Sequence, residues 1–173
     1  MHLNPYGEDP VRLATDLTWT PPATAGELTD RCRAAGVVAD RAGTEHDLAA
    51  VRAFLVRWLA VVDATDPARR AALLNDLLAE SSSSPRLTDH AGTGWHLHFR
   101  GDDLPLGAVL RALISVGTAL HLTSRGMDRL GRCALADCAR PYADFTRGGR
   151  QRYCSPACAN RDAVRRHRAR AAG

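Results

Sequence analysis

Four of the five cysteines fall in two close pairs near the end of the chain. Cys133 and Cys138 form a C-x4-C pair, Cys154 and Cys158 form a C-x3-C pair, and fifteen residues separate the two pairs. A tetrahedral zinc site needs four ligands such as thiolates, and two short-loop pairs bring four thiolates together at a small cost in chain entropy. The spacing therefore predicts one structural zinc ion held by these four cysteines.

The alternatives for these cysteines are disulfides or free thiols in a core. The N-terminal residues Met1 to Pro5 have neither the basic region nor the apolar stretch of a signal peptide, and no apolar run reaches the length of a membrane span. We therefore expect a cytoplasmic protein without a membrane segment. In a reducing cytosol, paired cysteines bind metal more often than they form disulfides.

A hairpin and a helix are the elements expected to position the cysteines. The residues between the two pairs include three strand-forming aromatic residues and a turn signal at Arg147 to Arg150, so they predict a β-hairpin. Ser155 suits a helix N-cap and Pro156 the first helical position, so a helix is expected from there to Arg170. The positive end of that helix favours a thiolate in its first turn. The pattern is typical of a treble-clef-like zinc finger.

Arginine is unevenly distributed along the chain. Residues 125–173 contain twelve arginines and four acids, a net charge of +8, whereas residues 1–124 carry a net charge of −4, and the chain contains no lysine. This asymmetry points to a polyanion partner for the basic end, because guanidinium groups suit phosphate oxygens and the guanine edge. A GC-rich genome would also favour arginine and alanine, which is the alternative reading of the composition.

The predicted C-terminal helix carries its arginines in rows. Positions 161, 165 and 168 share one face, and positions 166 and 170 form a second row. The helix is either a solvated charged tail or a nucleic-acid-binding helix, and we favour the second because the metal fixes its first turn. The residues predicted to contact nucleic acid are Arg147, Arg150, Arg152, Asn160, Arg161, Arg165, Arg166, His167, Arg168 and Arg170.

The C-terminal segment carries a motif made up of Cys138, Tyr142, Asp144, Thr146-Arg147, Arg150, Arg152-Tyr153-Cys154, Cys158-Ala159-Asn160-Arg161 and His167-Arg168-Ala169-Arg170. This motif resembles the CGNR zinc-finger family. Ala159 stands where the family has glycine, a mild change within a helix. The family resembles bacterial transcriptional regulators in which an N-terminal domain called ABATE precedes the finger. The resemblance implies zinc at the four cysteines and DNA contact by the basic residues.

Residues 1–124 are expected to form a mostly helical domain with a small β-hairpin, followed by the finger at 125–173, so the fold class is α+β. Residues 11–19 suit a short helix or strand. Capping residues and i, i+3, i+4 spacing predict helices over 24–36, 44–62, 66–81 and 105–122. Strands are expected at 86–88 and 95–99, and a link at 124–131. Cys32 has no cysteine nearby and is expected in the core, with redox sensing as the alternative.

Two histidines alternate with apolar residues in the predicted strand at 95–99. His96 and His98 would lie on the face opposite Trp95, Leu97 and Phe99. They suit a second metal site, an acid and base pair, or a solvated polar face, and no third ligand is placed by sequence. We expect a small-ligand pocket between the sheet and the helices, lined by Trp58, His96 and His98, as in a sensor domain.

The leading functional hypothesis is a zinc-dependent, DNA-binding transcriptional regulator whose N-terminal domain dimerises or senses a small-molecule effector. A lone finger buries little area on duplex DNA, so a homodimer is expected. The alternative is an RNA-binding or protein-interaction module with a structural zinc ion. An enzyme is not expected, because His167 stands apart from any second histidine of the kind that nuclease fingers use to hold a catalytic cation.

Overall fold

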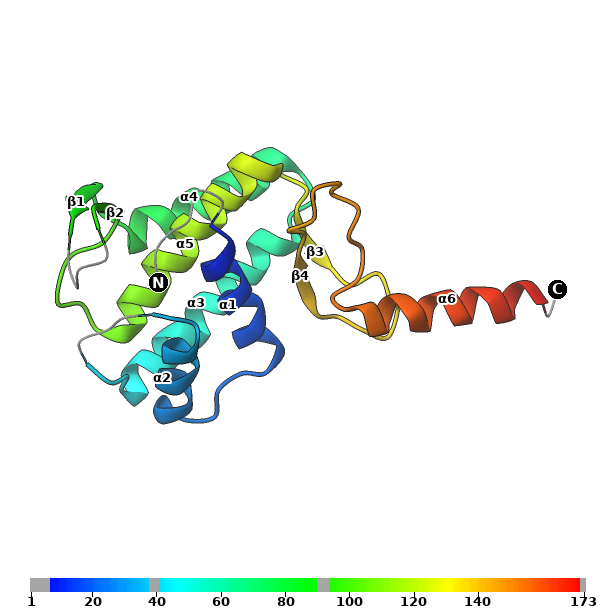
Figure 1. Cartoon of the computed structure of the whole chain (residues 1–173), viewed down its shortest axis with the longest axis horizontal. Coiled ribbons are helices and arrows are strands. Elements are labelled where there is room, and N and C mark those ends of the chain that lie inside the picture. The colour runs from blue at the N-terminus through cyan, green and yellow to red at the C-terminus, as the bar shows by residue number, and fades with distance from the viewer. Residues whose placement is uncertain (1–6, 38–40, 90–93, 172–173) are drawn as a thin grey trace.

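The computed structural model describes residues 7–37, 41–89 and 94–171, and helices make up most of them (Figure 1). The helices are α1 (Glu8–Trp19), α2 (Ala25–Ala34), α3 (Glu45–Asp63), α4 (Pro67–Ser81), α5 (Leu106–Arg125) and α6 (Pro156–Ala171). The strands β1 (Arg86–Thr88) and β2 (His96–His98) form one antiparallel pair, and β3 (Leu130–Arg132) and β4 (Pro141–Ala143) form another. The α+β class is confirmed.

Three helices begin at the predicted capping residues. The Thr24 hydroxyl accepts a hydrogen bond from a backbone N–H of the first turn of α2, and Asp66 does the same for α4. Helix α3 begins with a complete capping box, in which the Thr44 and Asp47 side chains each accept a hydrogen bond from the backbone N–H of the other residue. The segment expected to be a helix or a strand is the helix α1. In α2, α3 and α4, one backbone N–H of the first turn is thus bonded to the side chain of the N-cap residue.

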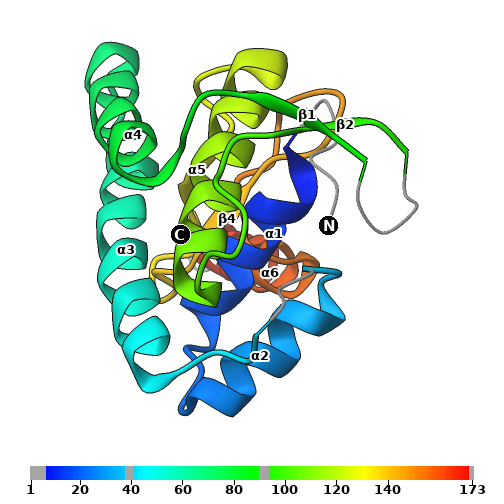
Figure 2. The same ribbon diagram turned by 90° about the vertical axis from the view of Figure 1, so that its left-hand side faces the viewer.

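Helix α5 is the centre of the hydrophobic core. Figure 2 shows it between α3 and α4 on one side and α1 on the other, and it packs against all three. By length and composition α5 is the one helix among the described residues that suits a membrane span, although no such run was expected from the sequence. About 67% of its apolar window is buried inside the protein, as in the core helix of a soluble protein.

Two residues singled out in the sequence lie in this core. Cys32 is 1% exposed, which confirms its predicted burial, and that burial raises the pKa of its thiol to about 11. A thiol with such a pKa stays protonated at neutral pH and is a poor nucleophile, which counts against redox sensing. The Trp58 side chain is fully buried, and its indole N–H donates to the Thr118 hydroxyl over 3.0 Å.

The β1–β2 hairpin is more exposed than expected for a sheet that covers a ligand pocket. Strand β2 spans three residues rather than five, and Leu97 lies directly opposite Leu87. These two side chains are 48% and 70% exposed, and Trp95 is 75% exposed. The apolar side chains therefore face solvent here, because alternation along a strand predicts two faces but not which one is covered.

The hairpin predicted between the two cysteine pairs was assigned to the wrong residues. Strands β3 and β4 flank the first pair, with Leu130 opposite Ala143 in the register. Residues 144–153 form a loop instead, because Asp144 accepts backbone N–H groups from Thr146 and Gln151 over 2.8 and 3.0 Å. The predicted link at 124–131 is correspondingly shorter, since α5 extends to Arg125 and β3 begins at Leu130.

Candidate metal centre

The four paired cysteines are positioned by the tip of one hairpin and the start of one helix. Cys133 directly follows β3, and its N–H donates to the Arg140 carbonyl over 3.0 Å. Cys138 closes a turn by donating its N–H to Leu135 O over 2.8 Å. Cys154 precedes α6 by two residues, and Cys158 lies in the first turn of that helix. The chain thus brings the pairs together without a long flexible segment.

The four sulfur atoms form a cluster of the size that zinc requires. All four lie within 4.8 Å of one another. The Sγ–Sγ distances are 3.6 Å from Cys138 to Cys154, 3.5 Å from Cys154 to Cys158 and 3.8 Å from Cys138 to Cys158. Zinc–sulfur bonds of about 2.3 Å in a tetrahedron place the sulfur atoms about 3.8 Å apart. Disulfides, with sulfur atoms about 2.05 Å apart, are excluded, and none of the five cysteines is disulfide-bonded.

The environment of the cluster favours metal over free thiols. The ligands pack around Leu135, which is 2% exposed, and against Trp19 and the two tyrosines of the finger. The Ser155 side chain, followed by the neighbouring thiols, lowers the pKa of Cys158, whereas burial and the neighbouring thiols raise the pKa of Cys154. A divalent cation is the charge partner that allows all four sulfurs to ionise together.

Residues 129–171 match the family model of the CGNR zinc finger. The four-cysteine cluster lies inside the matched segment, and one structural zinc ion is the cofactor that it holds. The resemblance found in the sequence is thereby confirmed for the CGNR finger, and the ABATE assignment of residues 1–124 stays a prediction. No curated protein matches the chain.

Backbone and side-chain contacts join the two halves of the CGNR finger. The N–H of Ala134 donates to the Arg152 carbonyl over 2.7 Å, which joins the cysteine turn to the segment before α6. Arg161 on α6 reaches Asp137 beside Cys138 over 2.6 Å. The Tyr153 hydroxyl donates to Asp162 over 2.7 Å. The direction of α6 is therefore fixed by these contacts as well as by the metal.

The CGNR finger is joined to the helical body through a mixed apolar and polar interface. Leu130 and Ala143 of its hairpin belong to the same hydrophobic core as the helices. The Trp19 indole N–H donates to the Pro141 carbonyl over 2.7 Å, and Arg132 forms a two-bond ion pair with Asp63 at 2.6 and 2.9 Å. The domain division after residue 124 stays a prediction, but packing is continuous across it.

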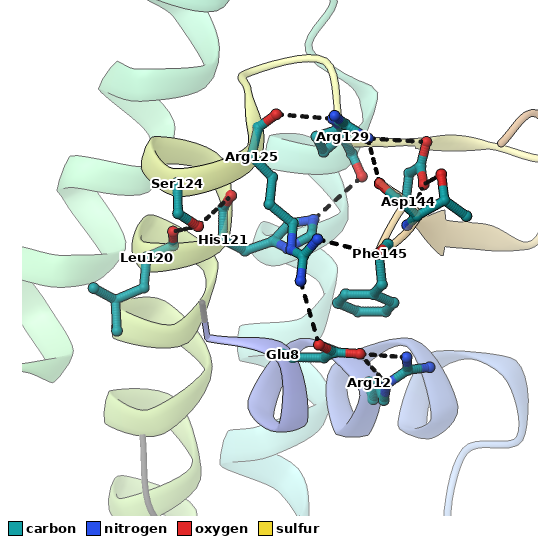
Figure 3. Close-up of polar contacts among 10 residues, drawn as sticks. Glu8, Arg12, Leu120, His121, Ser124, Arg125, Arg129, Asp144 and Phe145 are labelled. Atoms are coloured by element: carbon teal, nitrogen blue, oxygen red, sulfur yellow. Dashed lines mark hydrogen bonds and ion pairs between the residues drawn. The ribbon is translucent and has the colours of Figure 1, made fainter. Parts of the chain in front are cut away.

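A second part of this interface surrounds His121 (Figure 3). The His121 ring is fully buried, lies 4.9 Å from the Phe145 ring, and has a lowered pKa, first because of burial. Arg125 donates to the Phe145 carbonyl over 3.1 Å and lies 3.5 Å from Glu8. Arg129 lies 3.4 Å from Asp144. The end of α5 thus contacts both α1 and the loop at 144–153.

The predicted nucleic-acid contacts divide into two groups. Arg161 and Arg166 are engaged in ion pairs with Asp137 and Asp162, which the sequence did not reveal. The other predicted arginines are surface-exposed and form no ion pair with any described residue: Arg147, Arg150, Arg152, Arg165, Arg168 and Arg170. Asn160 and His167 are exposed on α6.

The residues of the predicted ligand pocket lie in different places. Trp58 lies in the core, whereas His96 and His98 lie on the surface hairpin, with their Nε2 atoms 3.1 Å apart. Within the described ranges, no third ligating side chain joins the two histidines to make a metal site. The pocket made of these three residues stays a prediction.

Sequence reasoning missed the roles of Asp144 and Arg129, which shape the loop of the finger. Asp144 is 2% exposed, and burial opposes its ionisation, yet hydrogen bonds from Thr146 and Gln151 outweigh that effect and lower its pKa. Arg129 donates to the Thr146 carbonyl over 3.0 Å and anchors the loop from the other side. An Asp two residues before a Thr is a recognised turn signal, and it would have indicated a loop closed by a side chain.

Proposed function

We propose that the protein is a zinc-dependent, DNA-binding transcriptional regulator in which the CGNR finger contacts duplex DNA. The observation that carries this proposal is the exposure of α6. Every described residue from Ala163 to Ala171 is exposed, and the helix extends away from the helical body (Figure 1). A basic helix fixed at one end and free along its length suits insertion into a groove.

The charges of the finger support the same proposal. The six arginines without an intramolecular ion pair among the described residues lie on the loop at 144–153 and on α6. Guanidinium groups that no carboxylate neutralises are available for phosphate oxygens. A shallow groove on one face of α6 is lined by Asn160, Val164 and Arg168. The amide, methyl and guanidinium groups of these side chains are of the kinds that contact base edges in DNA.

Salt dependence tests DNA binding directly. We expect the zinc-loaded chain to bind a labelled 20-base-pair duplex of random sequence at about 50 mM salt. With about four phosphate contacts, log K should fall with log salt at a slope of about −3.6. The double variant Arg165→Ala, Arg168→Ala should reduce the slope by about 2. The control Arg33→Ala, an exposed arginine on α2, should leave it unchanged.

Two outcomes would count against DNA as the partner. The first is the absence of duplex binding at low salt. The second is a single-stranded RNA that displaces the duplex at equal concentration, which would favour the RNA-binding alternative. Cleavage of the duplex with added Mg²⁺, abolished by His167→Ala, would show an enzyme, which we do not propose.

We propose further that the helical body acts in the cytoplasm as a homodimerisation or effector-sensing unit. The exposed apolar side chains of the β1–β2 hairpin, Leu87, Trp95 and Leu97, support an interface with a second copy of the chain. Sedimentation should give a dimer at micromolar concentration, and Leu97→Lys should shift it to monomer. A monomer at all accessible concentrations would contradict this part of the proposal.

A further inference from the structure

A cleft of about 440 Å³ lies where α1 meets the CGNR finger. Its wall on the α1 side includes Arg12, Thr15 and Trp19, and its wall on the finger side includes Tyr142 and Gln151. The volume is in the range of small-molecule sites. Because the walls come from two parts of the chain, a molecule bound there would touch the helical body and the finger at once.

The polar end of this cleft contains the ion pair of Glu8 and Arg12. The guanidinium of Arg12 uses Nε and Nη2 to bind Glu8 at 3.2 and 2.5 Å, and Arg125 lies 3.5 Å from the same carboxylate. Two guanidinium groups therefore share one carboxylate (Figure 3). The Nη1 atom of Arg12 makes no hydrogen bond to the described residues, and its side chain is 57% exposed. This donor suits an incoming anion.

The remaining walls are aromatic. The ring of Trp19 is held in place because its N–H is already bonded to the Pro141 carbonyl. The Tyr142 ring packs against Gly131, where an added Cβ would lie 3.1 Å from the tyrosine hydroxyl oxygen. Arg12 also covers the Phe145 ring at 4.1 Å, so its guanidinium is oriented by two neighbours. Fixed aromatic rings beside an oriented guanidinium select a planar, apolar ligand with one negative charge.

We propose that this cleft binds a small aromatic carboxylate, with the carboxylate on Arg12 and the ring against Trp19 and Tyr142. The finger side of the cleft includes Thr146 and Gln151, which belong to the loop that carries Arg147 and Arg150. We expect the bound ligand to act as an effector of DNA binding. This regulatory step is separate from the binding step and rests on the proposed function. A carboxylate beside this loop reduces the positive potential that attracts phosphate.

Calorimetry on the full, zinc-loaded chain tests the binding step without DNA. We expect 2-naphthoate to bind with a Kd on the order of 0.1 mM and benzoate about tenfold more weakly, because the second ring buries more apolar surface. The neutral analogue 2-naphthamide should bind at least tenfold more weakly than the acid. Saturable binding of neither acid, or equal binding of acid and amide, would overturn the proposal.

The location of the site is tested by nuclear magnetic resonance of the three indole N–H groups. The resonance of Trp19 should shift on addition of 2-naphthoate, whereas those of buried Trp58 and of Trp95 on the distant hairpin should stay in place. Assignment by Trp→Phe substitution identifies each signal. A shift confined to Trp95 would place the ligand elsewhere and overturn the proposal.

Two variants test the role of the cleft residues. Arg12→Gln should weaken 2-naphthoate binding at least tenfold, and the matched control Arg33→Gln should not. Thr15→Phe keeps the Arg12–Glu8 pair and fills the cleft, so it should abolish binding even if Arg12→Gln perturbs α1. Unchanged affinity in both variants would overturn the assignment. Zinc content is measured alongside to verify an intact finger.

The regulatory step has its own readout. Saturating 2-naphthoate should weaken binding of the random 20-base-pair duplex about threefold or more in the unmodified chain and have no effect in Thr15→Phe. Unchanged DNA affinity with confirmed 2-naphthoate binding would overturn the regulatory step alone. Absence of DNA binding before any ligand is added would instead be a failure of the proposed function.

Discussion

At the scale of single residues, the metal centre depends on four sulfurs whose separations suit a tetrahedral ion. Each sulfur belongs to a different local structure: the end of a strand, a hydrogen-bonded turn, the residues before a helix, and the first turn of that helix. Cysteine spacing alone predicted these ligands, because two short-loop pairs have few ways to satisfy four thiols in a small core. The turn closed by Asp144 had a local signal in Thr146, but the role of Arg129 could not be read from spacing, because it depends on which segments meet in space.

The first prediction concerns a zinc ligand. Cys158→Ser should lose stoichiometric zinc and reduce the helical signal of α6, because the first turn of that helix loses its attachment to the metal. Elemental analysis and far-ultraviolet circular dichroism measure the two effects. The control Cys32→Ala removes a buried thiol outside the cluster and should keep one zinc per chain. Full zinc content in Cys158→Ser would contradict the assignment of this ligand.

The second prediction concerns the buried carboxylate of the finger loop. Asp144→Asn should cost about 1–3 kcal/mol, because it weakens the bonds from Thr146 and Gln151 and removes the charge partner of Arg129. Since folding lowers the pKa of Asp144, its stabilisation is fully present above the unfolded pKa of about 3.9 and is lost as pH falls through the folded pKa. Denaturation of both proteins should therefore show a constant difference between about pH 5 and 8. A difference that grows with rising pH in this window would contradict the assignment.

At the scale of elements, α4 connects the helical body to the finger through one buried guanidinium. Arg70 is 4% exposed and donates to the carbonyls of Val61 and Val62 at 3.0 Å, to that of Leu130 at 3.2 Å, and to that of Met127. Its guanidinium therefore provides hydrogen-bond donors to backbone carbonyls at the end of α3 and at the start of β3. Burial lowers its pKa, and the hydrogen bonds to carbonyl oxygens compensate for its lost hydration.

The third prediction tests this connection. Arg70→Met should lower the free energy of unfolding by about 3 kcal/mol, because four carbonyls lose a shared donor in a region closed to water. Urea denaturation measures the change, and Arg69→Met on the exposed face of α4 is the matched control. Zinc content should remain one per chain in both variants. Equal stability of the two variants would show that Arg70 does not stabilise the junction.

Elements were predictable from the sequence where their signals are local. Capping residues at Thr24, Thr44 and Asp66 marked the starts of three helices because an N-cap acts within one turn. The finger hairpin was misplaced because strand-forming aromatic residues also serve as packing partners of a loop. Gly149 does adopt a left-handed turn, with φ of 64°, but the turn belongs to a loop closed by Asp144. The contacts of Asp144 with the rest of the loop therefore determine that this segment is a loop and not a hairpin.

At the scale of the whole molecule, the finger hairpin is part of the main hydrophobic core. Leu130 and Ala143 are 3% and 5% exposed and belong to the cluster that holds α1, α3 and α5 together. Trp19 lies at the end of α1 and also packs against the cysteine cluster. Loss of the metal should therefore weaken the helical body as well as the finger.

The fourth prediction follows from that continuity. Calorimetry should show one cooperative thermal transition for the zinc-loaded chain. Chelation of zinc should lower the midpoint temperature of that transition. Near-ultraviolet circular dichroism of buried Trp58 reports the unfolding of the helical body. A Trp58 transition that is insensitive to chelation would show that the finger unfolds independently. The same result would support separate domains at 1–124 and 125–173.

The shape of α6 has a mechanical consequence. Its 16 residues span about 24 Å, with the metal at one end and no other described part of the chain beside its far half. With the sulfur cluster as the pivot, a tilt of the helix by about 10° would displace its tip by about 4 Å. That displacement is close to the rise of one base pair, about 3.4 Å. Slight adjustments at the pivot would then change which step of a duplex the tip reaches.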